Sequence, residues 1–277
     1  MRSAGHGGTW GRGVVATAAM AAAGSAAVLG GELAWVVHRD LPSFEGSDAS
    51  GRYEPARSTA AAPLVLVALG DSTLTGPGLD DERELWLWQA LHAAAPDRPV
   101  DVRSFAVGGW RVADVRRRIG AALACQPDVA VVAVGSNDAI HGTARAAFAR
   151  ELDLVVEELT GRIPVVAVAN VGDLGNLERV PPPLSSLLRH RARGIRREIE
   201  AVVDRHPRAV LLDVAACDAA FAQGGVFVAD RFHPNAAGHQ LWAACAVPGL
   251  VESLGRVGVA CGQDGRTWTA SSSAPRR

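Results

Sequence analysis

The chain has 277 residues, of which 48% are hydrophobic, and its formal net charge at pH 7 is −1. Apart from an unusual N-terminus, roughly 215 residues remain, enough for one α/β domain with a sizeable core and too few for two. The 28 residues counted as lysine or arginine are all arginine, and they form no basic block with interleaved aromatic residues. This composition argues against a nucleic-acid partner. The sequence also lacks a glycine-rich loop with lysine, which argues against a phosphate-binding enzyme.

The N-terminal region contains an apolar stretch, residues 14–37, that is long enough to cross a membrane. It is interrupted only by Thr17, Ser25 and Glu32, and two arginines precede it, which favours a cytoplasmic N-terminus. Three interpretations are open: an uncleaved membrane anchor, a signal peptide cleaved near residues 24–27, or a soluble alanine-rich helix. The first two predict a main domain outside the cytoplasm, either anchored to the membrane or secreted.

Composition divides the chain into four parts. A linker rich in Pro, Ser, Gly, Ala and charged residues is expected between the apolar stretch and the main domain. The predicted parts are an anchor or signal segment at 1–39, the linker at 40–62, the main domain at 63–256 and a C-terminal tail at 257–277.

Valine-rich apolar runs alternate with amphipathic stretches along the main domain. Strands are predicted at 64–69, 100–105, 128–134, 164–169 and 209–214. They do not alternate strictly between apolar and polar residues, which is typical of strands covered on both faces. Helices are predicted at about 82–95, 111–123, 143–160, 185–206 and 235–246. This order favours a three-layer α/β/α sandwich around a central, mostly parallel five-stranded sheet.

Chemically useful residues fall at one edge of this predicted sheet. Ser72, Gly109 and Asn137 each follow a different predicted strand, while Asp230 and His233 lie in the loop before the last helix. In doubly wound sheets, ligands bind beyond the C-terminal ends of the strands. These five residues are therefore expected to form one site.

The residue types suit acyl transfer through a serine. Ser72 supplies a hydroxyl that needs a base, and His233 can act as that base if a carboxylate orients its ring. Asp230 lies three residues before His233, so a turn brings the two side chains to one side. The alternative base, His239, is expected deeper in the following helix. The sequence around Ser72 lacks the second glycine of G-x-S-x-G, so the nucleophile elbow of α/β-hydrolases is not matched.

Such a reaction also needs donors for the developing oxyanion. The backbone N–H groups of Ser72 and Gly109 and the side-chain amide of Asn137 are the candidates. Each piece taken alone has a structural alternative: a capping turn at Ser72, an ordinary βα turn at Gly109, an Asx turn at Asn137 and a helix-capping loop at 230–233.

Four short blocks occur in a fixed order: Gly70-Asp71-Ser72, Gly109, Gly135-Ser136-Asn137-Asp138 and Asp230-Arg231-Phe232-His233. The ordered set resembles the SGNH hydrolases, also called the GDSL esterase/lipase family. The resemblance implies a flavodoxin-like SGNH fold and carboxylic ester hydrolysis without a metal or organic cofactor. It also implies that Ser72 is the nucleophile, Asp230 and His233 complete the triad, and Ser72, Gly109 and Asn137 form the oxyanion hole. One departure is Ser104, where the family often has asparagine.

The substrate implied by this resemblance is a small acyl ester, a lipid or an acylated sugar, with the membrane as a partner through the N-terminal segment. Two alternatives remain open: acyl transfer or deacetylation on cell-envelope sugars or lipids with the same residues, and a non-catalytic envelope-binding module. Residues 170–194 are expected to form a loop at the mouth of the site followed by a basic helix. That helix either meets anionic head groups or presents a solvated face. Trp86, Trp88 and Trp110 are expected in the core or in the pocket wall.

The four cysteines, Cys125, Cys217, Cys245 and Cys261, contain no C-x-x-C pair, which argues against a zinc knuckle or a thioredoxin motif. If the protein is exported, some of these cysteines can pair, and four cysteines allow three complete connectivities. The spacing does not choose among them.

Overall fold

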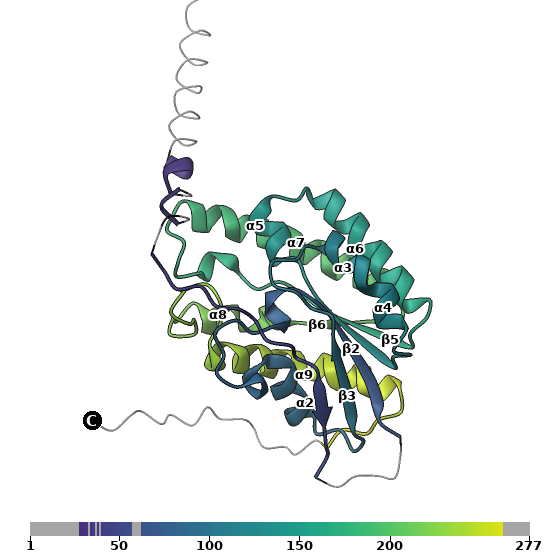
Figure 1. The fold of residues 1–277 in the computed structure, drawn as a ribbon. Helices are drawn as coiled ribbons and strands as arrows, with labels where there is room; N and C mark the ends of the chain where they lie inside the picture. The colour runs from purple at the N-terminus through teal and green to yellow at the C-terminus, as the bar shows by residue number, and fades with distance from the viewer. Residues whose placement is uncertain (1–27, 33, 37, 39, 57–61, 263–277) are drawn as a thin grey trace, which may run out of the picture.

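A six-stranded sheet lies between two layers of helices (Figure 1) in the structure, a computed structural model that describes residues 28–32, 34–36, 38, 40–56 and 62–262. The strand order is β1-β3-β2-β4-β5-β6, and β1 is antiparallel to its neighbour while the other strands are parallel. The strands are β1 (Gly51–Tyr53), β2 (Leu64–Gly70), β3 (Val100–Ser104), β4 (Val129–Ala133), β5 (Val165–Ala169) and β6 (Ala209–Leu212).

The central strands bury both faces, which explains their continuous apolar composition. In β2, Leu64 and Leu66 pack on one side of the sheet, while Val67 and Leu69 pack on the other. The first side is covered by α2 (Trp86–Ala94) and α9 (Ala236–Arg256). The second side is covered by α3 (Val112–Val115), α4 (Ile119–Leu123), α6 (Arg145–Thr160) and α7 (Leu184–Arg205). The three-layer sandwich predicted from the sequence is therefore the observed fold (Figure 1).

The sheet has six strands rather than the five predicted. The additional strand, β1, falls within the segment expected to be a linker, 40–62. It pairs antiparallel with β3, and Tyr53 is buried against His92 at a ring-centroid distance of 5.2 Å. A three-residue strand with two exposed residues gives no periodic signal, so sequence reasoning had no means of finding it.

Helix α9 is longer than the predicted 235–246 and continues through Pro248 to Arg256. A proline inside a helix removes one hydrogen bond and usually ends the helix. Here Ala246, Leu250 and Leu254 are fully buried against the sheet, so apolar burial offsets the lost bond. Beyond α9, Val259 is also buried, and the amide of Gly262 donates to the carbonyl of Ala95. The first residues of the expected tail therefore pack on the domain.

Most of the predicted anchor or signal segment, residues 14–37, lies outside the described residues. Within the described part of the chain, no helix combines the length and the apolarity needed to cross a bilayer. The described portion of the segment contacts the domain: the Glu32 carboxylate accepts a hydrogen bond from the amide of Leu184 at 2.9 Å, at the start of α7. The guanidinium of Arg179 donates to the carbonyl of Val36 at 3.1 Å.

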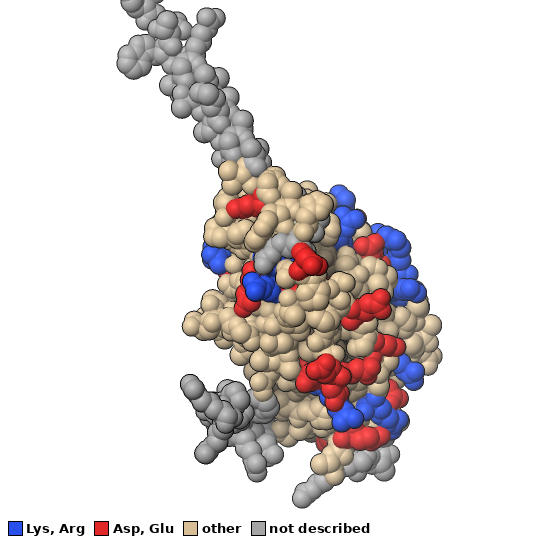
Figure 2. Space-filling model, turned by 60° about the vertical axis from the view of Figure 1, so that its left-hand side comes forward, with Lys and Arg blue, Asp and Glu red and all other residues tan. Residues whose placement is uncertain are grey.

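Charge is distributed over the surface without a large single-sign field on the face that Figure 2 shows. Arginine and acidic side chains are interspersed along one part of this face, beside a broad area without charged groups. The near-neutral net charge of the chain is consistent with this mixture.

The ends of β2 and β4 approach each other unusually closely at Gly70. A Cβ atom at this position would lie 2.1 Å from the carbonyl oxygen of Ala133. We expect Gly70→Ala to lower the free energy of unfolding by about 1–3 kcal/mol, because the strands must separate to admit the methyl group. Urea denaturation measures the change.

Gly120→Ala is the matched control, because a Cβ atom at that helical glycine would meet no atom within 4 Å. Alanine there should leave stability unchanged or raise it by up to about 1 kcal/mol. Equal unfolding midpoints for the two variants would contradict the steric role assigned to Gly70.

Candidate active site

Ser72 lies at the exit of β2, at the start of a short 3₁₀ helix, Ser72–Leu74. The preceding residue, Asp71, caps this helix: its Oδ1 accepts a hydrogen bond from the amide of Thr73 at 2.9 Å. The amide of Asp71 in turn donates to the carbonyl of Ala133 on β4. Sequence and backbone together therefore hold the serine at the carboxyl edge of the sheet, where its side chain is partly exposed.

Asp230 and His233 form one compact turn. The Nδ1 atom of His233 lies 2.7 Å from Oδ2 of Asp230, and the other carboxylate oxygen accepts from the amides of Phe232 and His233. Asp230 is 3% exposed, so this pairing is shielded from water. Arg231, with φ of 58°, reverses the chain within the turn. Because Nδ1 is held by the carboxylate, Nε2 is the imidazole nitrogen left for proton exchange.

Ser72 and His233 line the same cleft, which has a volume of about 70 Å³. One wall comes from the loop after β5, and the opposite wall comes from α8 (Asp218–Phe221), the 227–234 region and α9. Most of the larger lining side chains are apolar: Leu174, Leu177, Phe221, Phe227, Phe232 and Trp242. The cleft therefore suits an apolar group next to the serine.

Two carboxylates at the cleft are held by arginines of α7. Asp173 pairs with Arg189 at 2.8 Å, and Asp218 pairs with Arg196 at 2.5 Å. Asp218 also accepts a hydrogen bond from the amide of Asp173 at 2.7 Å, which joins the two walls. The expected loop at the site mouth is therefore found in the cleft wall. Two arginines of the basic helix hold this wall through ion pairs, a role that was not predicted from the sequence.

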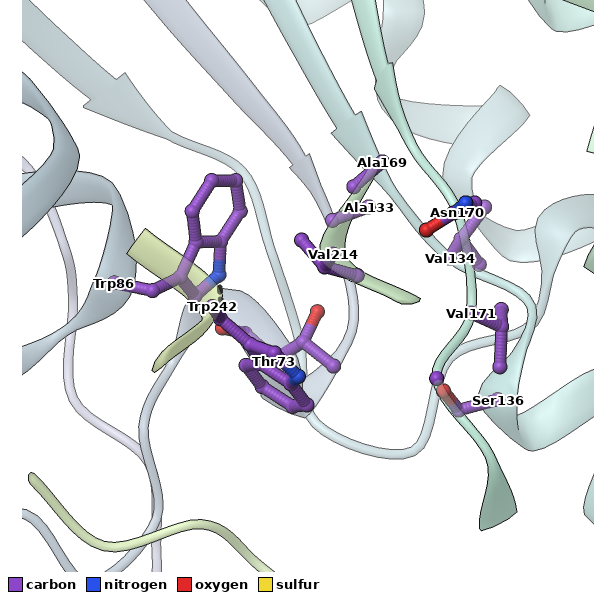
Figure 3. A pocket seen from close by; sticks show the side chains of 11 residues that line it. Thr73, Trp86, Ala133, Val134, Ser136, Ala169, Asn170, Val171, Val214 and Trp242 are labelled. Carbon is purple, nitrogen blue, oxygen red and sulfur yellow. Dashed lines mark hydrogen bonds between the residues drawn. The ribbon is translucent and has the colours of Figure 1, made fainter. Parts of the chain in front are cut away.

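A smaller cavity of about 20 Å³ continues from the cleft toward the sheet (Figure 3). Thr73, Ser136, Gly172 and Trp242 line both spaces. The inner cavity is otherwise bounded mainly by small apolar residues and one indole: Ala133, Val134, Ala169, Val171, Val214 and Trp86. Its position makes it an apolar extension of the cleft.

Trp86, Trp88 and Trp110 take different places. Trp86 lines the inner cavity, and its Nε1 donates to the carbonyl of Thr73 at 2.8 Å (Figure 3). Trp88 packs in the core, whereas the carbonyl of Trp110 accepts a bond from Asn137. The indole of Trp242, which lines both the cleft and the inner cavity, was not singled out from the sequence. It lies nine residues after His233 on α9, so helical periodicity alone did not mark it as a cleft residue.

The predicted oxyanion donors lie on the loops beside Ser72. A Cβ atom on Gly108 would lie 3.9 Å from the Cβ atom of Ser72, and Gly109 has a positive φ of 81°, a conformation that favours glycine. The side-chain nitrogen Nδ2 of Asn137 lies 3.0 Å from the carbonyl oxygen of Trp110 and 3.3 Å from Oδ2 of Asp71. Asn137 begins the helix α5 (Ser136–His141) with Ser136, and this short helix was not predicted. Both protons of this side-chain amide already have acceptors, so the amide must release one of these acceptors before it can donate to a ligand.

Two buried carboxylates, Asp71 and Asp138, lie beneath this loop. Burial raises the pKa of Asp71 to about 6; the neighbouring Asp138 adds to the rise, and hydrogen bonds from Thr73 and Asn137 oppose it. Burial also raises the pKa of Asp138, although the amide of Val112 donates to its Oδ2 at 3.0 Å. These two acids tie the loops after β2, β3 and β4 together.

The alternative base, His239, is buried between α9 and α2. Its Nδ1 accepts a hydrogen bond from the amide of Trp86 at 3.3 Å, and its ring meets Trp242 edge-on at 5.5 Å. Burial, helped by the nearby His233, lowers the pKa of His239 to about 3. The ring is therefore neutral at physiological pH, and it does not line the cleft. Among the described residues, no group of three or more His, Cys, Asp and Glu side chains is arranged to hold a metal ion.

Comparison with known proteins identifies the family. A sequence profile of the GDSL-like lipase/acylhydrolase family matches residues 68–241, more than half of the chain. No curated protein matches the sequence.

Several solved structures share the fold. The structure of LAE5, an alpha/beta hydrolase from the metagenome of Lake Arreo in Spain, superposes with a TM-score of 0.56 at 20% identity, covering 70% of this chain and 97% of that chain. Axe2, an acetylxylan esterase from Geobacillus stearothermophilus, gives 0.55 at 18% identity over 72% of this chain and 95% of that chain. TesA gives 0.55 at 21% identity over 67% and 97%. Identities this low show likeness of fold.

The profile match covers the four motif blocks, and the fold is shared with the solved structures named above. The resemblance noted in the sequence is thereby confirmed. The chain belongs to the GDSL-like lipase/acylhydrolase family of SGNH hydrolases and is a carboxylic ester hydrolase.

Proposed function

We propose that the chain hydrolyses esters through a Ser72–His233–Asp230 triad and a covalent acyl-enzyme. The observation that carries this proposal is the turn in which Asp230 holds the His233 imidazole at 2.7 Å, in the cleft that Ser72 also lines. A buried carboxylate on Nδ1 fixes the tautomer of the histidine and stabilises the imidazolium that forms. No other described histidine lines that cleft.

In the proposed reaction, Nε2 of His233 removes the proton of Ser72 while the serine oxygen attacks the acyl carbon. The imidazolium then protonates the departing alcohol, and a water activated by the same nitrogen releases the acid. The backbone N–H groups of Ser72 and Gly109 and the amide of Asn137 stabilise the oxyanion. The amide of Asn137 leaves one of its two present acceptors when the oxyanion develops.

The cleft supports an acyl group longer than acetyl. Its walls are aromatic and aliphatic, and the inner cavity, at about 20 Å³, adds room for about one further small group. The related Axe2 is an acetylxylan esterase by its printed description, and a short acyl group on a sugar is the competing substrate. We place the acyl chain in the apolar cleft, with its end directed toward Trp242.

Replacing the proposed nucleophile should abolish turnover. We expect Ser72→Ala to lower kcat on p-nitrophenyl butyrate by about 10⁴-fold or more, because the covalent route is lost. The control is Ser136→Ala, which removes another serine hydroxyl from the same cleft and should change kcat only a few-fold. Retained turnover in purified Ser72→Ala would reject the mechanism, as would unchanged labelling of that variant by a fluorophosphonate.

Asp71 is expected to favour activity at the expense of stability. Its folded pKa of about 6 exceeds its ordinary value of 3.8, so the folded state is favoured most below pH 3.8 and loses that advantage as the pH rises through 6. This loss amounts to roughly 3 kcal/mol. Asp71→Asn should remove this pH-dependent loss, so the free energy of unfolding of the variant should rise relative to that of the wild type between pH 4 and 7. Its kcat should fall about tenfold, since Asn137 loses its anionic partner.

Urea denaturation at pH 4, 5, 6 and 7 measures the free energy of unfolding of the wild type and of Asp71→Asn. His239 has a lowered pKa and changes stability with pH in the opposite direction, but it does so equally in both proteins, so its effect cancels in the difference between them. Stability that falls with pH by the same amount in both proteins would contradict the assignment. The conservative variant Asp71→Glu keeps the charge but not the fit, and should not recover the stability at pH 7.

Opening the inner cavity should change acyl-chain preference. Trp242→Ala removes an indole that lines both the cleft and the inner cavity and so enlarges the apolar space, and kcat/KM for a decanoyl ester relative to a butyryl ester should rise about tenfold. A p-nitrophenyl ester series measures this ratio, and Trp242→Phe serves as the control that retains an aromatic ring. An unchanged ratio in folded Trp242→Ala would place the acyl chain elsewhere.

A further inference from the structure

Two cysteines meet between the 3₁₀ helix Val214–Cys217 and α9, outside the proposed catalytic groups. Cys217 is 6% exposed, and its thiol donates to the carbonyl of Val214 at 2.9 Å. Cys245 lies in the third turn of α9 and packs against the cluster of buried residues that contains Cys217. Both pack in one small apolar cluster with Phe221 and Trp242.

The surroundings of this pair suit a structural bond rather than redox catalysis. Reactive cysteines have a lowered pKa, usually from a nearby cation or a helix N-terminus. Here burial raises the pKa of both thiols. Neither thiol is therefore a reactive thiolate at neutral pH, and a bond formed between them would be shielded from reductants by the cluster.

The other two cysteines lie elsewhere in the fold. Cys125 packs at the edge of the second helical layer, with its thiol 3.8 Å from the carbonyl of Ala121. The backbone of Cys261 forms an isolated antiparallel β-bridge with Pro96 beyond the end of α9. Of the cysteine pairs that the sequence left open, the structure favours Cys217–Cys245.

We propose that Cys217 and Cys245 form a disulfide bond in the mature protein. The two thiols lose two protons and two electrons, which pass to a disulfide oxidant such as glutathione disulfide or a thiol–disulfide oxidoreductase, itself reduced to two thiols. The predicted export of the main domain would bring the pair into an oxidising compartment.

The bond would fasten a wall of the cleft. Cys217 directly precedes α8, whose Asp218 holds the opposite wall through the amide of Asp173. Phe221, at the end of α8, stacks on Trp242 at a centroid distance of 5.5 Å, one helical turn before Cys245. A covalent link between Cys217, which directly precedes α8, and α9 therefore limits separation of the cleft wall from the helix that follows the Asp230–His233 turn.

The test uses the full chain, purified and equilibrated with reduced and oxidised glutathione. Mass spectrometry of an alkylated, non-reduced digest should find one peptide that joins Cys217 to Cys245, about 2 Da lighter than the two reduced peptides together. Dithiothreitol should lower the Tm of the protein by roughly 5–10 °C, because the loop of the unfolded chain is no longer closed. Neither readout depends on catalysis.

A matched pair of variants isolates the bond. The double variant Cys125→Ser with Cys261→Ser should keep both the cross-linked peptide and the Tm shift, whereas Cys217→Ala with Cys245→Ala should show neither. Alkylation of Cys217 and Cys245 in the oxidised wild type would overturn the proposal. So would a cross-link from either residue to Cys125 or Cys261, or a Tm that dithiothreitol does not change.

Discussion

The buried carboxylate of Asp71 links the serine turn to the loop that follows β4. One oxygen receives the amide of Thr73, and the other receives the side-chain amide of Asn137. The close approach of Gly70 to Ala133 makes this possible, since it brings the ends of β2 and β4 together. Two residues that are 65 positions apart in the sequence, Ser72 and Asn137, are thereby held on adjoining loops.

This arrangement has a cost, which the rest of the fold must offset. Burying an acid without a cation beside it raises its pKa, and Asp71 is charged at neutral pH only at the expense of folding stability. The two apolar layers around the sheet supply the compensation, because the central strands are buried on both faces. A strained or costly group retained in a well-packed domain is typical of a functional site.

Most of the fold and of the candidate site could be predicted from local patterns in the sequence. The parallel strands are apolar throughout, and Asp230 and His233 share one turn, so both features are visible within a few residues. What could not be predicted depends on packing between distant segments. The strand β1 depends on pairing with β3, the extension of α9 depends on the sheet beneath it, and the place of Trp242 depends on the two cavities that it lines. The apolar stretch near the N-terminus stays a prediction, since it lies mostly outside the described residues.

Helix α9 connects the features that would otherwise be independent. Its N-terminus follows the turn that contains His233, its first turns bury His239 against α2, and Trp242 lines both the cleft and the inner cavity. One turn further, Cys245 meets Cys217. A shift of this helix would move the proposed base and the cleft wall together. The C-terminal half of α9 is buried against the sheet beyond Pro248. This burial holds the helix in place and therefore fixes the position of the turn that contains His233 at its N-terminal end.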